Sequence, residues 1–377
     1  MISSQKSLFN IPDNVIFLNT AYMSPLLNSV VDAIDYGTRL KAKPWKIKIS
    51  DFYENTARAR NLFSKIVSTS SNCISIIPSA SYGIETAAKN LKVSPSHSIL
   101  LLENQFPSNV YPWIRLAKLS DAKVKFVGNS AELDLTENIL QAIDEKCDIV
   151  ALPNVLWTNG ELINLFKVKE KCTQNDTQLV LDLTQSAGAM WIDLDRLEPD
   201  FAVIANYKWM LGPYSTGFLY VHPKHHHGNP LEEGWITKEN SRNFSQLTNY
   251  ANEYESGAIR YDMGERANFS LMPGVIKALE QILIWGVKNI EKTLEENNNN
   301  LSTKIGQLGL KTIPSNRRGP HFLSVKLPLG VCKNLICKLE MKGIYLSERA
   351  GSLRITPHLW NTREDFDYFI DELSINL

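Results

Sequence analysis

Short apolar runs alternate with amphipathic stretches from about residue 70 to residue 225. The amphipathic stretches, such as WIRLAKL, LTENILQAI and FKVKEKC, place their apolar residues at helical spacing. Strands that alternate with helices are typical of a parallel sheet with crossover connections, so the pattern predicts an α/β fold with a mostly parallel sheet. The predicted strands are SILLLE (98–103), KVKFV (123–127), DIVAL (148–152), QLVLDL (178–183), FAVIA (201–205) and GFLYV (217–221).

The order of elements changes after a polar region at 224–258. A long helical pattern starts near Pro273, and we expect the asparagine tract at 297–300 to end or interrupt it. The rest predicts the strand HFLSVKL, the helix KNLICKLEMK, the strands IYLSE and SLRIT, and the helix REDFDYFIDEL. We therefore expect a large α/β domain over 15–260. Residues 1–14 and 261–377 should form a smaller α+β domain with a connecting helix.

Composition narrows the class of protein. The 377 residues carry 40 Lys plus Arg and 40 Asp plus Glu, so no overall charge favours nucleic acid or an anionic membrane. The five cysteines are odd in number and scattered, which suits a reducing compartment. The N-terminal sequence MISSQKSLFN lacks the apolar core of a signal peptide, and Glu280 and Lys288 interrupt the most apolar stretch. We expect a cytoplasmic protein.

Two charged residues end otherwise apolar strands. Asp182 ends QLVLD, and Lys208 follows FAVIA closely. Ligands bind at the carboxyl ends of the strands in such sheets, so both side chains are expected to project into one crevice. Each residue alone is more simply explained, Asp182 as a turn or N-cap residue and Lys208 as a solvated lysine. The pair suits pyridoxal 5′-phosphate (PLP), which needs a lysine amine and a carboxylate beside its pyridine nitrogen.

Two further segments could complete a PLP site. In SIIPSASYGIETAAKNL a strand leads through small residues into a helix that we expect to begin near Tyr82. Ala80 and Ser81 are therefore candidates for phosphate binding, although an ordinary helix cap explains this segment equally well. Phe106, in ENQFPSNVYPW, could stack on the cofactor ring, but taken alone it is more simply a core residue.

These motifs together resemble the class V aminotransferase group of fold-type I PLP enzymes, which includes cysteine desulfurases, isopenicillin N epimerase-like proteins and kynureninases. The resemblance runs from FLNTAYMSP to SLRITPHLWNTREDFD, and its centre is the segment from Asp182-x-x-Gln185 through Tyr207-Lys208 to GPYSTGFLYV. It implies the PLP-dependent transferase fold, with Lys208 bound to PLP as an imine. Asp182 would pair with the pyridine nitrogen, and Gln185 would lie near the ring hydroxyl.

The resemblance also implies roles for other residues. Tyr207, Ala80 and Ser81 would hold the phosphate, and Phe106 falls where similar enzymes place the stacking aromatic residue. Trp235, in EGW, and Asn268, in RYDMGERAN, resemble segments that reach the phosphate of a neighbouring subunit, which implies a homodimer with shared sites. Without the resemblance, Trp235 would be a loop or core aromatic residue and Asn268 a helix cap.

Arg354 matches the arginine that binds the substrate α-carboxylate in the family, and its planar fork suits bidentate recognition. A surface salt bridge is the simpler alternative. However, Arg354 lies mid-strand in an apolar run, where an unpaired guanidinium would be costly. Asn19 and Arg349 are weaker candidates for the same pocket. Tyr22, Trp157 and His358 are candidates for its distal wall, and each could equally be a packing residue.

The resemblance implies an enzyme that acts on an amino acid through an external aldimine, with Lys208 removing the α-proton. Transamination is our first interpretation. A β-eliminating or hydrolytic lyase and an amino-acid epimerase are the alternatives, and a non-catalytic PLP-fold binding module is the alternative outside enzymes.

A persulfide-forming desulfurase is disfavoured because the loop before Arg354 reads SERAGSLR, without a cysteine, and Cys332 and Cys337 lie on a predicted helix. The run His225–His227 is interpreted as a solvated loop, so no metal site is expected.

Overall fold

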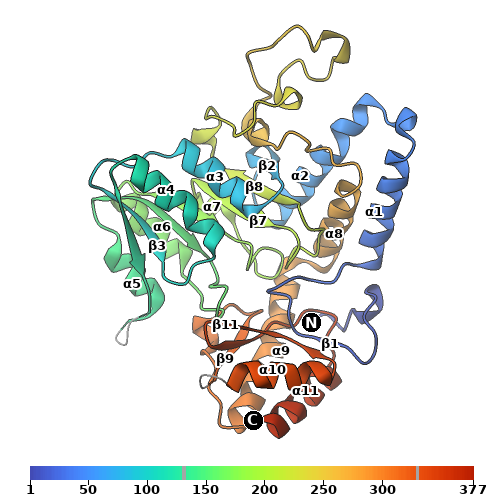
Figure 1. The fold of residues 1–377 in the computed structure, drawn as a ribbon, viewed down its shortest axis with the longest axis vertical. Helices are drawn as coiled ribbons and strands as arrows, with labels where there is room; N and C mark the ends of the chain where they lie inside the picture. The colour runs from blue at the N-terminus through green and yellow to red at the C-terminus, as the bar shows by residue number, and fades with distance from the viewer. Residues whose placement is uncertain (130–132, 328–330) are drawn as a thin grey trace.

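A computed structural model describes residues 1–129, 133–327 and 331–377. Its centre is a seven-stranded sheet in the order β2-β8-β7-β6-β5-β3-β4 (Figure 1). Pairing is parallel from β7 to β4, and only β8 runs antiparallel to its neighbours β7 and β2. The prediction of a mostly parallel sheet is confirmed. The strands are β2 (Ile74–Ile77), β3 (Ser98–Leu102), β4 (Lys123–Val127), β5 (Cys147–Pro153), β6 (Gln178–Asp182), β7 (Phe201–Ala205) and β8 (Gly217–Val221).

Helices cover both faces of this sheet, which explains why its inner strands are continuously apolar. In β3, Ile99 and Leu101 pack into one core with α3 and α4, whereas Leu100 and Leu102 pack into a second core with α2, α5, α6 and α8. The helix α8 also packs against α1 and α2 (Figure 1). The helices are α1 (Asn28–Lys41), α2 (Glu54–Ile66), α3 (Ala80–Asn90), α4 (Tyr111–Leu119), α5 (Leu135–Ala142), α6 (Leu165–Gln174), α7 (Leu194–Leu197) and α8 (Met272–Trp285).

A smaller C-terminal domain has its own sheet and core, in the lower part of Figure 1. Its three-stranded sheet has the order β11-β12-β9, and a parallel pair joins β1, near the N-terminus, to β10. A third hydrophobic cluster lies between these strands and the helices. The elements are β1 (Ile16–Phe17), α9 (Val287–Gln307), β9 (Leu323–Lys326), α10 (Val331–Met341), β10 (Ile344–Tyr345), β11 (Ser347–Arg349), β12 (Ser352–Ile355) and α11 (Arg363–Asn376). The exact domain boundaries stay a prediction.

The prediction that the asparagine tract ends or interrupts the long helix is wrong. Helix α9 continues through residues 297–300, and the interruption lies earlier, at Gly286, whose φ of +76° separates α8 from α9. Two asparagines are used in tertiary contacts: Asn298 Nδ2 donates to the Pro320 carbonyl (2.8 Å), and Asn299 Oδ1 accepts from Arg318 (2.6 Å). These contacts override a weak local propensity. In the part of the chain that the structure describes, no helix is both long and apolar enough to cross a membrane.

Candidate active site

One cavity, of about 200 Å³, lies where β5, β6 and β7 end and α3 begins. This is the place where the order of a parallel sheet leaves a crevice for ligands. The cavity brings together eight of the residues singled out in the sequence. They are Ala80, Ser81, Phe106, Trp157, Asp182, Gln185, Tyr207 and Lys208.

Lys208 lies in the turn that follows β7, and its side chain is 7% exposed. Among the described residues, no hydrogen-bond acceptor or carboxylate pairs with its amine. The Nζ atom lies 5.5 Å from the centre of the Phe106 ring. Burial lowers the pKa of Lys208 to about 8, the charge of Asp182 opposes this shift, and the charges of Arg354 and Arg349 add to it. About a tenth of this amine is therefore neutral and nucleophilic at pH 7, far more than for a lysine with the ordinary pKa of 10.5.

Asp182 is the last residue of β6 and is buried. Its Oδ1 accepts a hydrogen bond from the Thr184 N–H (3.0 Å), and no cation of the described residues lies at ion-pair distance. Burial raises the pKa of this carboxyl, against the smaller opposing effects of Thr184 and Lys208. A buried carboxylate without a cationic partner is costly, and a protonated ring nitrogen in the cavity would supply that partner.

Gln185 takes part in three hydrogen bonds. Its Nε2 donates to the Ala21 carbonyl (3.0 Å), and its Oε1 accepts from Trp209 Nε1 (3.0 Å). His321 Nε2 lies 2.5 Å from the Gln185 carbonyl. Burial lowers the pKa of His321 to about 4, so the ring is neutral and its Nε2–H donates to that carbonyl. His321 was not predicted from the sequence, in which 136 residues separate it from Gln185.

The start of α3 forms another wall. Helix α3 begins at Ala80 rather than near Tyr82, because Ser79 is the N-cap and its Oγ accepts from the Tyr82 N–H (3.2 Å). The N–H groups of Ala80 and Ser81 lie in the first turn, where a helix provides no acceptor, and they are available to an anion. Further hydroxyl groups in the lining, which the sequence analysis did not assign, belong to Ser79, Ser108, Thr184, Tyr214, Ser215 and Thr216.

Aromatic side chains enclose the cavity. Phe106 and Trp157 meet edge to face, with ring centres 5.4 Å apart. Tyr207 packs against Tyr214 at 4.6 Å, and burial raises the pKa of Tyr207 to about 12. The Tyr207 hydroxyl is therefore a hydrogen-bond donor at neutral pH, which suits a phosphate oxygen. Of the three residues considered for the distal wall, only Trp157 lines the cavity.

Arg354 lies beside this cavity on β12 and is 1% exposed. Its Nη1 donates to the Trp157 carbonyl (2.9 Å), and its Nε and Nη2 donate to Ser347 Oγ (3.1 and 2.7 Å). The Ser347 hydroxyl donates in turn to Asn19 Oδ1 (2.7 Å), so Asn19 supports Arg354 indirectly. The alternative of a surface salt bridge does not hold, because no carboxylate among the described residues pairs with this buried guanidinium. Burial lowers its pKa to about 9.

Four other residues do not line the cavity of this chain. Trp235 packs against Phe52 and Phe244 and is 41% exposed, and Asn268 Oδ1 accepts from the Leu271 N–H just before α8. Tyr22 is exposed, although it lies near enough to Tyr207 for its charge to raise the pKa of Tyr207. His358 is buried and stacks on Trp360, with ring centres 4.9 Å apart. The roles predicted for Trp235 and Asn268 concern a neighbouring subunit and stay predictions.

The histidine run is less solvated than we expected. His225 Nε2 lies 2.7 Å from Asp200 Oδ1, and the His225 ring stacks on Phe201. His226 is buried and its Nε2 contacts the Val221 carbonyl (3.1 Å). These histidines make separate contacts because neighbouring side chains leave the backbone in different directions. Among the described residues, no group of metal-ligating side chains could hold an ion.

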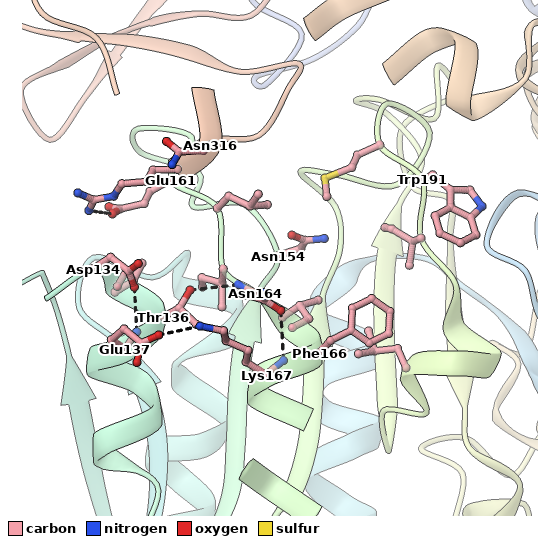
Figure 2. Close-up of a pocket in the computed structure, with 18 of the residues that line it drawn as sticks. Asp134, Thr136, Glu137, Asn154, Glu161, Asn164, Phe166, Lys167, Trp191 and Asn316 are labelled. Carbon is pink, nitrogen blue, oxygen red and sulfur yellow. Dashed lines mark hydrogen bonds and ion pairs between the residues drawn. The ribbon is translucent and has the colours of Figure 1, made fainter. Parts of the chain in front are cut away.

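A second cavity, of about 320 Å³, lies where α5 and α6 begin (Figure 2). It shares no lining residue with the first cavity. Its charged groups already have partners, since Lys167 pairs with Glu137 (2.9 Å) and Arg317 pairs with Glu161 (2.9 Å). An amine and a carboxylate without an ion-pair partner among the described residues, those of Lys208 and Asp182, line the first cavity instead.

Comparisons with known proteins identify the family of the chain. The family model "Aminotransferase class-V" matches residues 16–363, and the chain belongs to that family. An uncharacterized aminotransferase of Schizosaccharomyces pombe is 23% identical, over 94% of this chain and 89% of its own length. A probable cysteine desulfurase of Borreliella burgdorferi is 24% identical, over 95% and 87%. A structure of a lysine-to-alanine mutant of C-DES, with glycine linked covalently to its PLP, has a TM-score of 0.88 at 19% identity and covers 99% of both chains.

The protein is therefore a PLP-dependent enzyme of the aminotransferase or lyase type. Its own residues fit this cofactor. Lys208 offers an unpartnered amine, Asp182 a buried carboxylate without a cation, and the first turn of α3 offers N–H groups for a phosphate. None of the four cysteines whose side chains the structure describes lines this cavity.

Proposed function

We propose that the protein transfers the amino group of an α-amino acid. The observation that carries this proposal is the arrangement of Lys208 and Arg354. Lys208 lines the cavity with an amine that has no partner among the described residues, and Arg354, which has no carboxylate partner among them, donates to the carbonyl of Trp157 in the cavity wall. A guanidinium that lacks a carboxylate of its own suits the α-carboxylate of a substrate. An amine with a pKa of about 8 suits proton transfer at the neighbouring carbon.

Each residue has one task in this proposal. PLP, when bound, withdraws electrons from the substrate α-carbon and so makes its proton acidic. Arg354 holds the α-carboxylate and thereby orients the α-proton towards Lys208, which accepts it. Asp182 keeps a positive charge on the ring nitrogen by its own negative charge. Phe106 and Trp157 cover the cavity with aromatic surface and exclude water from the reacting carbon.

The products distinguish transamination from the lyase alternative. The purified protein with PLP is incubated with a panel of single amino acids, and both the organic product and the form of the cofactor are identified. Transamination predicts a keto acid together with pyridoxamine phosphate. Pyruvate or alanine with unchanged PLP would instead identify a β-eliminating or hydrolytic lyase. A racemised substrate would identify an epimerase, and no change with any amino acid would contradict the proposal.

The rate of PLP binding to the cofactor-free protein should depend on pH. Because only the neutral amine of Lys208 attacks the aldehyde, the rate constant should rise about tenfold per pH unit below a pKa of about 8 and level off above it. Stopped-flow absorbance measures it. An Arg354→Gln variant removes a positive charge that lowers this pKa, so its profile should move to higher pH. A wild-type rate that still rises near the ordinary lysine pKa of 10.5 would contradict the prediction.

We also propose a homodimer in which Trp235 and Asn268 reach the site of the partner. This proposal is supported by the position of both residues outside their own cavity and by the exposed aromatic surface of Trp235. An inactive Lys208→Ala chain mixed with an inactive Asn268→Ala chain should regain activity, up to about a quarter of the wild-type value if subunits exchange at random. Recovery is measured after mild dissociation and reassociation. A monomer in analytical ultracentrifugation, or no recovery from confirmed mixed dimers, would contradict shared sites.

A cytoplasmic location is part of the same proposal. It is supported by Cys73, Cys147 and Cys172, which are free, buried thiols. Burial raises the pKa of Cys147 to about 11 and that of Cys172 to about 12, which keeps them protonated and unreactive.

A further inference from the structure

The small three-stranded sheet has one apolar and one cationic face. Strand β12 pairs with β9 and β11, so residues in register lie on the same side. One side carries Leu323, Val325, Leu353 and Ile355, which are all buried in the core of the small domain, together with the half-buried Glu348 in register with Leu353. The other side carries three serines and three cations, with no acidic residue. They are Ser324, Lys326, Ser347, Arg349, Ser352 and Arg354.

This cationic face is turned towards the active site. Arg354 donates to the Trp157 carbonyl, and Ser324 Oγ donates to the Asn159 carbonyl (2.6 Å). Both acceptors belong to the loop that follows β5 in the large domain, and Trp157 itself lines the cavity. A substrate that extends from Lys208 past Trp157 therefore meets this face of the small sheet.

Arg349 is the neighbour of Arg354 on this face. It pairs with Ser352, two residues before Arg354, so the two arginines are diagonal neighbours on adjacent strands. The charge of Arg349 adds to the lowering of the pKa of both Arg354 and Lys208. Arg349 Nη1 donates only to the carbonyl of the adjacent Glu348 (2.7 Å), and no carboxylate of the described residues pairs with either guanidinium. Two neighbouring cations without anions repel each other.

The hydrogen bonds of Arg354 limit what it can bind. Its guanidinium has five N–H donors, and three of them are used by Ser347 and the Trp157 carbonyl. Two N–H groups remain, one on Nη1 and one on Nη2, and together they can donate to one carboxylate. Arg349 is then left without an anionic partner among the described residues, beside Arg354 on the sheet and near enough to Lys208 for its charge to lower the pKa of that amine.

We propose that Arg349 binds a second anionic group at the end of the substrate side chain. The preferred substrates are then amino acids with an acidic side chain, a carboxylate as in aspartate and glutamate or a sulfinate of the same shape. Arg354 and Arg349 would each take one anion. This inference rests on the proposed function, because it assigns the α-carboxylate to Arg354.

The test compares substrates that differ in charge and not in shape, namely glutamate with glutamine and aspartate with asparagine. The measured quantity is the ratio of kcat/KM for the acidic member to kcat/KM for the amide. In the wild type this ratio should exceed 1, and in Arg349→Gln it should fall by roughly 10- to 100-fold, as expected for a lost hydrogen bond to a charged group. Arg349→Lys should restore part of it. Lys326→Gln, which removes a charge from the same face without touching the arginine pair, should change the ratio less than about twofold.

A binding measurement gives a readout apart from turnover. Succinate and glutarate carry two carboxylates but no amine, so they should bind the PLP-loaded wild type without reacting, and calorimetry measures their affinity. Arg349→Gln should weaken that binding by the same roughly 10- to 100-fold. Equal losses for acid and amide in Arg349→Gln would show that both arginines share one carboxylate, and would overturn the inference. A wild-type ratio of 1, or a ratio that falls as far in Lys326→Gln, would overturn it too. If the Arg349 inference fails in this way but neutral amino acids still react, the proposed function is not contradicted. If no amino acid reacts at all, the proposed function itself is contradicted.

Discussion

A Lys208→Ala variant should lose turnover by about 10⁴-fold or more, and without added amino acid it should lose the visible absorbance that depends on covalent attachment of PLP to Lys208. The chain offers no substitute, because Lys208 carries the only amine that lines the cavity among the described residues. Removal of the side chain therefore deletes both the covalent attachment of the cofactor and the group that accepts the α-proton. Absorbance spectra and steady-state kinetics on the same preparation check both effects.

The matched control is Lys118→Ala, which removes an exposed lysine from α4. It should keep wild-type absorbance and turnover. Circular dichroism should show that both variants are folded, since alanine at position 208 removes a buried charge rather than a core contact. Persistence of the absorbance of covalently attached PLP without added amino acid, or of more than a few per cent of turnover, in Lys208→Ala would contradict the role assigned to this lysine.

An Asp182→Asn variant should lower kcat by roughly 10²- to 10³-fold, the usual cost of removing one preorganised electrostatic group from an active site. Asparagine keeps the shape and can still accept the hydrogen bond from Thr184, so the loss isolates the negative charge. Because the charge of Asp182 raises the pKa of Lys208, its removal should shift the pH profile of PLP binding to lower pH. A kcat within threefold of the wild type would show that the charge is not needed.

The same substitution should stabilise the cofactor-free protein. Burial raises the folded-state pKa of Asp182 above its unfolded value, so the ionised carboxyl destabilises the fold once the pH rises through that pKa. Asparagine has no such charge, and the cofactor-free variant should melt at a higher temperature than the wild type at pH 7 while losing activity. A lower melting temperature would indicate that Asp182 has a structural partner in the empty site.

The positions of Asp182 and Lys208 at strand ends could be predicted from the sequence because they depend only on where each strand ends along the chain. Residues that follow β6 and β7 must lie at the carboxyl edge of a parallel sheet, so Asp182 and Lys208 had to converge. The helix start at Ala80 was placed two residues too late, although the Ser79 cap was visible as a serine three residues before Tyr82. Arg354 was matched to the family arginine through the resemblance, its place in an apolar strand argued against a surface salt bridge, and the structure shows it buried.

Contacts between distant segments could not be predicted. His321 reaches the Gln185 carbonyl from the small domain, and nothing in its local sequence indicates that contact. The asparagine tract has a poor helix propensity, yet α9 continues because Asn298 and Asn299 find partners near Pro320 and Arg318. The pairing of β11 with β12 places Arg349 beside Arg354, which a linear spacing of five residues does not reveal.

Reduction and mapping show directly whether the cofactor is attached to Lys208. The purified protein is incubated with PLP, reduced with borohydride, digested and analysed by mass spectrometry. The mass of the reduced cofactor should appear on the peptide that contains Lys208 and should be absent from the same peptide of Lys208→Ala. Cofactor mass on another lysine, or on none, would show that Lys208 does not carry PLP.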